Sequence, residues 1–216
     1  MSRLLALYRD LRRDSRGLAL LEFAFTLPIL LMMSLGGAEL THYVTVKMRL
    51  SQIALQIADN AARMGNGTAT QAKQVTETDI NDLFIGAQLS SGRLDLRTNG
   101  RVILSNLEEK NPSGNKYRIT WQRCYGLKTH ASLYGVTGDN KAGIGPAGRQ
   151  ATAQSSTPTM FVEVYYVYQP IVGNLFVRAL GLTRTSSFSE IASMSVRDRR
   201  DVTQIYNTAG ATVATC

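Results

Sequence analysis

The fold is decided by one apolar stretch near the start of the chain, which reads LALLEFAFTLPILLMMSLGGA from Leu18 to Ala38. Glu22 is the one ionisable residue in it. As an α-helix the stretch would be about 30 Å long, because each residue adds about 1.5 Å, and that length equals the thickness of a bilayer's hydrocarbon core. The stretch therefore predicts a membrane-spanning helix over residues 18–40.

The charges ahead of the stretch predict its orientation. Residues 1–17 carry an excess of arginine over aspartate, with Arg3, Arg9, Arg12, Arg13 and Arg16 against Asp10 and Asp14. Because a positive excess stays on the cytoplasmic side of a membrane, we expect residues 1–17 to form a cytoplasmic leader and the chain after about residue 40 to be exported.

A cleaved secretory signal peptide is the alternative to an anchor. Such a peptide has an apolar region of about 7–15 residues and ends at a small-residue cleavage site. Here the apolar run is longer, contains an acid, and continues into helix-compatible sequence through Arg63. These differences favour a retained anchor.

Beyond the span the helical pattern becomes one-sided. Apolar residues recur at spacings of three and four, at Leu50, Ile53, Ala54, Ile57, Ala58 and Ala61. This periodicity predicts an amphipathic stem helix over residues 41–64, which Gly65-Asn66-Gly67 ends. Span and stem together predict one helix about 70 Å long at about 1.5 Å per residue.

Residues 65–216 are expected to form an exported α+β domain. Thr76, with Asp79 three residues later, is a capping signal for a short helix that has apolar residues on one face. After this helix Leu94 and Leu96 alternate with charged residues, which predicts a strand. Asn99-Gly100 then predicts a hairpin turn into a second strand over residues 101–107.

Three more strands and a loop complete the predicted domain. The third strand, residues 116–121, would place Tyr117, Ile119 and Trp121 on one face. Two further strands are predicted at Thr159–Gln169 and Phe188–Arg197, with one short helix between them in Ile171–Leu182. Residues 126–157 are typical of a long surface loop because small and polar residues dominate them. The predicted fold class is α+β, with a mainly antiparallel sheet packed against the stem of the long helix.

Both cysteines, Cys124 and Cys216, fall in the part of the chain predicted to be exported. Oxidising conditions there favour a disulfide, which would close a loop of about 90 residues and stabilise the domain by a few kcal/mol. The alternative is two separate buried thiols. Compartment and even count favour the bridge.

Composition argues against several classes of function. The net charge is +8, and without the leader it is +5, with the basic residues scattered among acids and no aromatic interleaving that would indicate nucleic acid. His42 and His130 have no neighbouring ligands at metal spacing. Gly143–Gly148 fits G-x-G-x-x-G by chance, because no strand precedes it and Pro146 lacks the amide that a phosphate would need. We therefore predict no catalytic residues, no metal and no cofactor.

Glu22 is the most informative residue, because an acid near the bilayer centre costs at least about 2.5 kcal/mol and so needs a partner. If the chain were cut after Gly17, Leu18 would carry a positively charged amine that Glu22 of a neighbouring subunit could neutralise. Alternatively, Glu22 reaches up to the headgroups or is neutral.

The run from Arg12 through Gly17 to Glu22-Phe23, with Pro28 further on, resembles a class III prepilin signal. Together with Gly37-Ala38-Glu39 it is similar to the TadE-like family of tight adherence (Tad, Flp-type) pilus proteins over residues 12 to about 60. The resemblance implies cleavage between Gly17 and Leu18 by a prepilin peptidase. It also implies that Glu22, Phe23 and Pro28 contribute to contacts between subunits.

The resemblance further implies a non-enzymatic minor pilin. Its expected partners are the prepilin peptidase, other pilin subunits, the inner-membrane assembly platform of the pilus and membrane lipid, with no nucleic acid. It would span the inner membrane once, with its C-terminal domain in the periplasm or, after assembly, on the pilus or cell surface. The exported domain of about 150 residues exceeds what a Flp major pilin allows, which favours the minor role. The alternative is an uncleaved, membrane-anchored periplasmic scaffold or binding protein.

Overall fold

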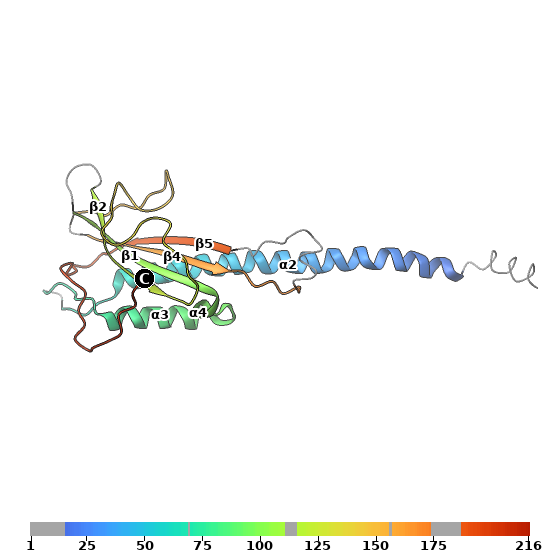
Figure 1. Cartoon of the computed structure of the whole chain (residues 1–216), viewed down its shortest axis with the longest axis horizontal. Coiled ribbons are helices and arrows are strands. Elements are labelled where there is room, and N and C mark those ends of the chain that lie inside the picture. Colours follow the sequence, from blue (N-terminus) through green and yellow to red (C-terminus); the bar gives the residue numbers. More distant parts are fainter. Residues whose placement is uncertain (1–15, 69, 111–115, 156, 174–186) are drawn as a thin grey trace, which may run out of the picture. The chain divides into compact units, whose positions relative to one another are not determined.

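The computed structural model describes residues 16–68, 70–110, 116–155, 157–173 and 187–216 (Figure 1). Its elements in chain order are α2 (Arg16–Arg63), α3 (Glu77–Ser91), η1 (Gly92–Leu94), α4 (Leu96–Asn99), β1 (Gly100–Glu109), β2 (Tyr117–Tyr125), β3 (Asn140–Lys141), β4 (Thr159–Val167) and β5 (Ser187–Ser195). The arginine-rich leader up to residue 15, and residues 174–182 of the predicted short helix, lie outside the described residues.

The long helix is confirmed as one continuous element. α2 has 48 residues with Pro28 inside it, and its bounds lie within two residues of the predicted 18–64. It ends where Gly65 adopts a φ of 106°, a left-handed conformation that glycine reaches at little cost. The chain divides into two compact units at residue 44 of this helix. In described residues, the first unit comprises residues 16–44 and 170–173, and the second comprises residues 45–169 and 187–216 with the gaps named above.

The second unit contains a five-stranded sheet in the order β3-β2-β1-β4-β5. Every neighbouring pair is antiparallel, and this confirms the predicted α+β fold class. β1 lies at the centre of the sheet. It pairs on one side with β2, the next strand in the sequence, and on the other side with β4, which follows much later in the sequence.

One face of the sheet carries the aliphatic pairs of β1 and β4 and lies against the short helices. Val102 pairs with Val164, and both are buried. The Tyr166 hydroxyl donates to the carbonyl of Leu94 at 3.0 Å. Phe84 of α3 stacks on Tyr125 of β2, with ring centroids 5.5 Å apart. α3 and η1 therefore cover this face.

The opposite face is covered by the segment that connects β2 and β4. Its buried cluster contains residues from β1, β2, β4 and the connection, namely Leu107, Ile119, Ile144, Ala153 and Phe161. Tyr134 of the connection meets Phe161 edge to face, with centroids 5.4 Å apart. The predicted loop over residues 126–157 is thus a cover for the sheet, and β3 is the one named strand among its described residues.

The capping signal before α3 is confirmed. The backbone N–H of Asp79 donates to the Thr76 hydroxyl at 3.1 Å, and the backbone N–H of Thr76 donates to the Asp79 carboxylate at 2.9 Å. This capping box satisfies two of the amides that a helix start would otherwise leave unpaired.

The predicted strand around Leu94 and Leu96 is wrong. Residues 92–94 form η1 and residues 96–99 form α4, because Asp95 adopts a left-handed φ of 45° and its carboxylate accepts from the N–H of Thr98. Hydrogen bonds from Thr98 and then Gln88 lower the pKa of Asp95. Leu94 and Leu96 are still buried. The alternation therefore indicated correctly that both side chains are buried, but it did not indicate that the backbone is helical.

The predicted hairpin turn at Asn99-Gly100 is also wrong. Asn99 ends α4, and Gly100 begins β1. A Cβ on Gly100 would lie 2.9 Å from the carbonyl oxygen of Tyr165. Glycine is needed here for the close approach of β4, so a turn was the wrong interpretation of this residue.

The predicted common face of Tyr117, Ile119 and Trp121 is also wrong. Asn106 pairs with Trp121 whereas Leu107 pairs with Ile119, so one residue of β2 between them has no partner on β1. Such a bulge reverses the alternation of side chains. Ile119 lies in the cluster under the connection, and Trp121 lies on the opposite face of the sheet.

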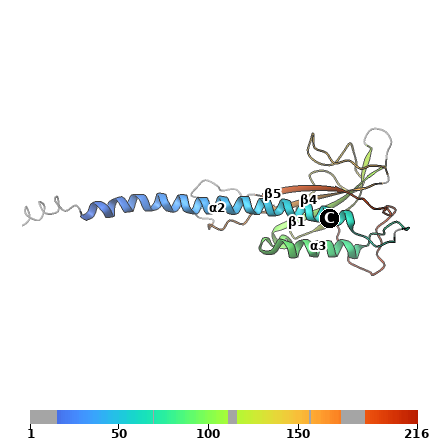
Figure 2. The same ribbon diagram turned by 180° about the vertical axis from the view of Figure 1, so that it is seen from behind.

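The stem half of α2 belongs to the same unit as the sheet. Its apolar stripe is buried and comprises Val46, Leu50, Ile53, Ala54, Ile57, Ala58, Ala61 and Ala62. In both views this half of α2 runs along the sheet and beside α3 (Figures 1 and 2). The periodicity of the stem therefore predicted its buried face correctly.

Candidate functional site

In the first half of α2, every residue from Gly17 to Leu35 is exposed. Gly17–Arg63 contains one window long and apolar enough to cross a membrane, and none of that window is buried. Its leucine, isoleucine, phenylalanine and methionine side chains from Leu18 to Met33 are 36% to 74% exposed. An apolar surface of this length needs lipid or other helices around it.

All the residues predicted for processing and assembly lie on this half of α2. Gly17 and Leu18 are in its first turn, and a Cβ on Gly17 would meet no atom within 4 Å. Leu18 and Glu22 are four residues apart and so share one face of the helix. Phe23 is exposed on the adjoining face. No described atom crowds Gly17, whereas the peptide bond predicted to be cut is part of a helical turn. The cut itself stays a prediction.

Glu22 is exposed and makes no hydrogen bond or ion pair within the described residues. An unpaired acid in an apolar surface has to find its partner outside this part of the chain or at the membrane surface. Its role between subunits therefore stays a prediction that the geometry permits.

Pro28 lies inside α2 and is exposed. Because proline has no N–H, the carbonyl of Ala24 one turn earlier loses its usual helical partner. In a lipid environment a neighbouring helix or a hydroxyl can satisfy such a group. The role of Pro28 in contacts between subunits stays a prediction.

Glu39 is a functional candidate to which the sequence analysis assigned no role, although Gly37-Ala38-Glu39 contributed to the family resemblance. It is the second acid of the anchor region and is only 9% exposed. Its carboxylate accepts the backbone N–H groups of Ile171 at 3.1 Å and Val172 at 3.0 Å. The one signal in the sequence was an acid directly after the apolar run.

Arg200 fixes the far end of α2. Its guanidinium donates to the carbonyls of Ala61, Ala62 and Met64 at 3.1, 3.2 and 2.8 Å. Burial lowers the pKa of Arg200 to about 10, so the group stays charged at neutral pH. A buried cation at the negative end of the helix dipole stabilises that end.

The disulfide predicted between Cys124 and Cys216 is present, with its sulfurs 2.14 Å apart. The segment before Cys216 is also held by backbone contacts, since the N–H of Cys124 donates to the carbonyl of Ala214 at 2.8 Å. The bridge closes the C-terminal segment onto β2.

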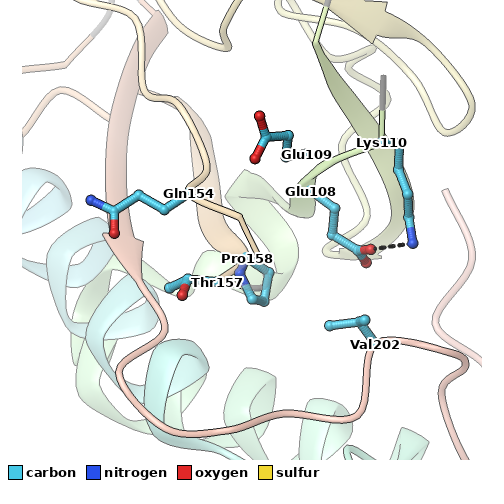
Figure 3. A pocket seen from close by; sticks show the side chains of 7 residues that line it. All are labelled: Glu108, Glu109, Lys110, Gln154, Thr157, Pro158 and Val202. Carbon is cyan, nitrogen blue, oxygen red and sulfur yellow. Dashed lines mark ion pairs between the residues drawn. The ribbon is translucent and has the colours of Figure 1, made fainter. Parts of the chain in front are cut away.

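A small hollow lies between the ends of β1 and β4 (Figure 3). Its lining residues are Glu108, Glu109, Lys110, Gln154, Thr157, Pro158 and Val202. Glu108 pairs with Lys110 at 2.8 Å, and it also accepts from the side chains of Asn106 and Thr120 at the bulge. The Glu108 carboxylate is therefore occupied in holding the bulge.

The two histidines lie in different parts of the structure. His130 stacks on Tyr165 with centroids 4.0 Å apart, and burial lowers its pKa. His42 lies on α2. Among the described residues no group of three potential metal ligands occurs.

Glu163 of β4 accepts from the Ser132 hydroxyl and from the N–H of Leu133 at 3.0 Å. These two hydrogen bonds hold the loop over residues 126–157 on the sheet.

Comparison with known proteins finds a family match in the N-terminal part of the chain. Residues 17–65 match the family model described as TadE-like protein. This confirms the resemblance read from the sequence, over the anchor and the stem. No curated protein and no solved structure matches the chain. The match is consistent with a protein associated with Tad pili.

Proposed function

We propose, from the TadE-like match of residues 17–65, that the chain is a minor pilin-like structural subunit of a Tad (Flp-type) pilus assembly system. Residues 18–40 cross the inner membrane once, with residues 1–17 in the cytoplasm and the sheet domain in the periplasm. The subunit has no enzymatic role. Its partners are the prepilin peptidase, other pilin subunits, the inner-membrane platform and membrane lipid.

The uncovered apolar half of α2 carries this proposal. Its side chains have nothing to pack against within the described chain, and it continues without a break into a stem that the sheet domain covers. A helix with one free half and one embedded half suits side-by-side packing of subunits. Glu22 and the amine of Leu18 then set the axial register, because an ion pair strengthens in low dielectric.

A second function remains open if the anchor is never cut. The chain would then be a membrane-anchored periplasmic scaffold or binding protein. The observation in its favour is that Gly17 and Leu18 lie within the first turn of α2, where a protease would have to unwind the helix to reach the peptide bond.

N-terminal sequencing of the protein from membranes separates the two functions. The pilin proposal expects a chain that begins at Leu18, and an intact Met1 in mature membranes would contradict it. Gly17→Val should abolish the cut, because bulk next to the bond obstructs the peptidase. Gly36→Val is the matched control, since a Cβ at either glycine meets no atom within 4 Å. The control variant should be cut like the wild type.

A further inference from the structure

Glu39 ties the start of the β4–β5 connection to α2. Its carboxylate accepts two backbone N–H groups, from Ile171 and Val172, and is itself buried. Residues 16–44 and 170–173 belong to the same compact unit. Pro170–Gly173 is therefore held beside one particular turn of α2.

That turn lies at a defined depth if α2 spans the membrane. Glu39 follows Leu18 by 21 residues, which is about 32 Å of helix at about 1.5 Å per residue. With Leu18 at the cytoplasmic boundary, Glu39 lies at the exported boundary of the hydrocarbon core. Because the amides of Ile171 and Val172 contact its carboxylate directly, both residues lie within about one helical turn, roughly 5 Å, of the same depth.

The side chains at this depth are apolar and exposed. Ile171 is 58% exposed and has no charged neighbour in Pro170–Gly173. On α2, Leu40 is 64% and Val44 is 47% exposed. The zone between hydrocarbon and water is roughly 5–7 Å thick on each side of a bilayer, so aliphatic side chains there bury themselves among lipid headgroups and upper acyl chains.

We propose that Pro170–Gly173, at the start of the β4–β5 connection, forms a second lipid contact, in which Ile171 lies in the headgroup region of the exported leaflet. Glu39 is its positioning residue, and Leu40 and Val44 form the adjoining lipid-facing surface of α2. The occupant is the phospholipid interface, because the contact continues the surface of the proposed membrane span. The inference rests on that span, and it adds a second contact that sets how deep the helix sits.

Site-specific fluorescence on the full chain tests this contact. Single cysteines replace Phe25, Ile171 or Leu127, and each receives an environment-sensitive label; the two native cysteines are joined and stay unlabelled. The proteins are reconstituted in vesicles of phosphatidylethanolamine and phosphatidylglycerol. Quenching is measured with nitroxide lipids and with iodide on both sides of the membrane. Phe25 reports on the span, and Leu127, which is 68% exposed in the sheet unit, reports on water.

We expect the label at Ile171 to be quenched by shallow nitroxide lipids and several-fold less by iodide than the label at Leu127. Equal iodide quenching at the two positions would overturn the proposal. Shielding from both quenchers would overturn it too, because a protein surface would then cover Ile171. Iodide quenching at Phe25 would show instead that the span, and with it the proposed function, is wrong.

The role of Glu39 is tested in the same proteins. Glu39→Ala removes the carboxylate and should raise iodide quenching at Ile171 towards the value at Leu127, while the label at Phe25 keeps its lipid quenching. Glu39→Gln retains one acceptor oxygen, so its iodide quenching at Ile171 should lie between that of the chain with Glu39 and that of Glu39→Ala. If Glu39→Ala leaves the label at Ile171 unchanged, Glu39 does not position the connection.

Discussion

Removing the disulfide between Cys124 and Cys216 should lower the free energy of unfolding of the sheet unit by about 2–4 kcal/mol. The two residues are 92 positions apart in sequence. The chain-entropy relation gives about 4.6 kcal/mol for a loop of this length at 25 °C. We expect less than this, because the C-terminal segment is also held by the backbone of Ala214 and by the Asn81 side chain, which donates to the carbonyl of Thr212.

Urea unfolding of the full chain in detergent micelles measures the effect. Trp121 is the one tryptophan of the chain and lies three residues before Cys124 on β2, so its fluorescence follows this part of the sheet. With a slope of about 2 kcal/mol per molar urea, the double variant Cys124→Ala, Cys216→Ala should unfold at a urea concentration about 1–2 M lower.

The control is the wild type with the bridge reduced. It has no change in side-chain volume, so agreement with the double variant assigns the loss to the covalent link. A folded double variant that loses less than about 1 kcal/mol would refute the reasoning. It would show that the contacts of the C-terminal segment close the loop without the bond.

Three further changes test other parts of the structure. Glu22→Ala should leave membrane insertion intact and reduce the number of pili seen by electron microscopy, because the acid proposed to set the register is gone; unchanged piliation would remove the register hypothesis. Burial raises the pKa of Glu163, so the folded chain holds this proton more tightly than the unfolded chain does, and stability falls as pH rises from the ordinary carboxyl value through the folded one. Glu163→Gln should lose that slope in urea unfolding at different pH values, and identical slopes in both proteins would contradict the assignment. Arg200→Ala should lower the free energy of unfolding by about 1–3 kcal/mol, because three carbonyls at the end of α2 lose their donor. The control Arg199→Ala, at an exposed position, should lower it by less than about 0.5 kcal/mol. Equal losses for the two variants in urea unfolding would contradict this role of Arg200.

The sequence by itself determined the elements whose signals are local. The bounds of α2 followed from hydropathy and from a period of three to four residues, both of which depend on neighbours within the same helix. The start of α3 followed from Thr76 and Asp79, which bond to each other three residues apart. β1, β4 and β5 followed from runs of β-branched, aromatic and alternating residues. For the predicted site, the same local signals correctly placed Gly17, Leu18 and Glu22 on one helix.

Only the tertiary structure decided the features that depend on distant contacts. Leu94 and Leu96 alternate like a strand, but Asp95 and the approach of Tyr165 to Gly100 make a helical corner. The bulge in β2 is set by pairing with β1, so no pattern within β2 alone could show that Trp121 changes face.

Glu39 illustrates the same limit at the membrane anchor. In the sequence it is one acid after an apolar run. Its importance comes from Ile171 and Val172, which follow 132 and 133 residues later. Period and propensity report how a residue relates to its own helix or strand, whereas a hydrogen bond across such a separation exists only once the chain has folded. The long apolar helix was therefore predictable from the sequence, and the contact of Glu39 with Ile171 and Val172 was not.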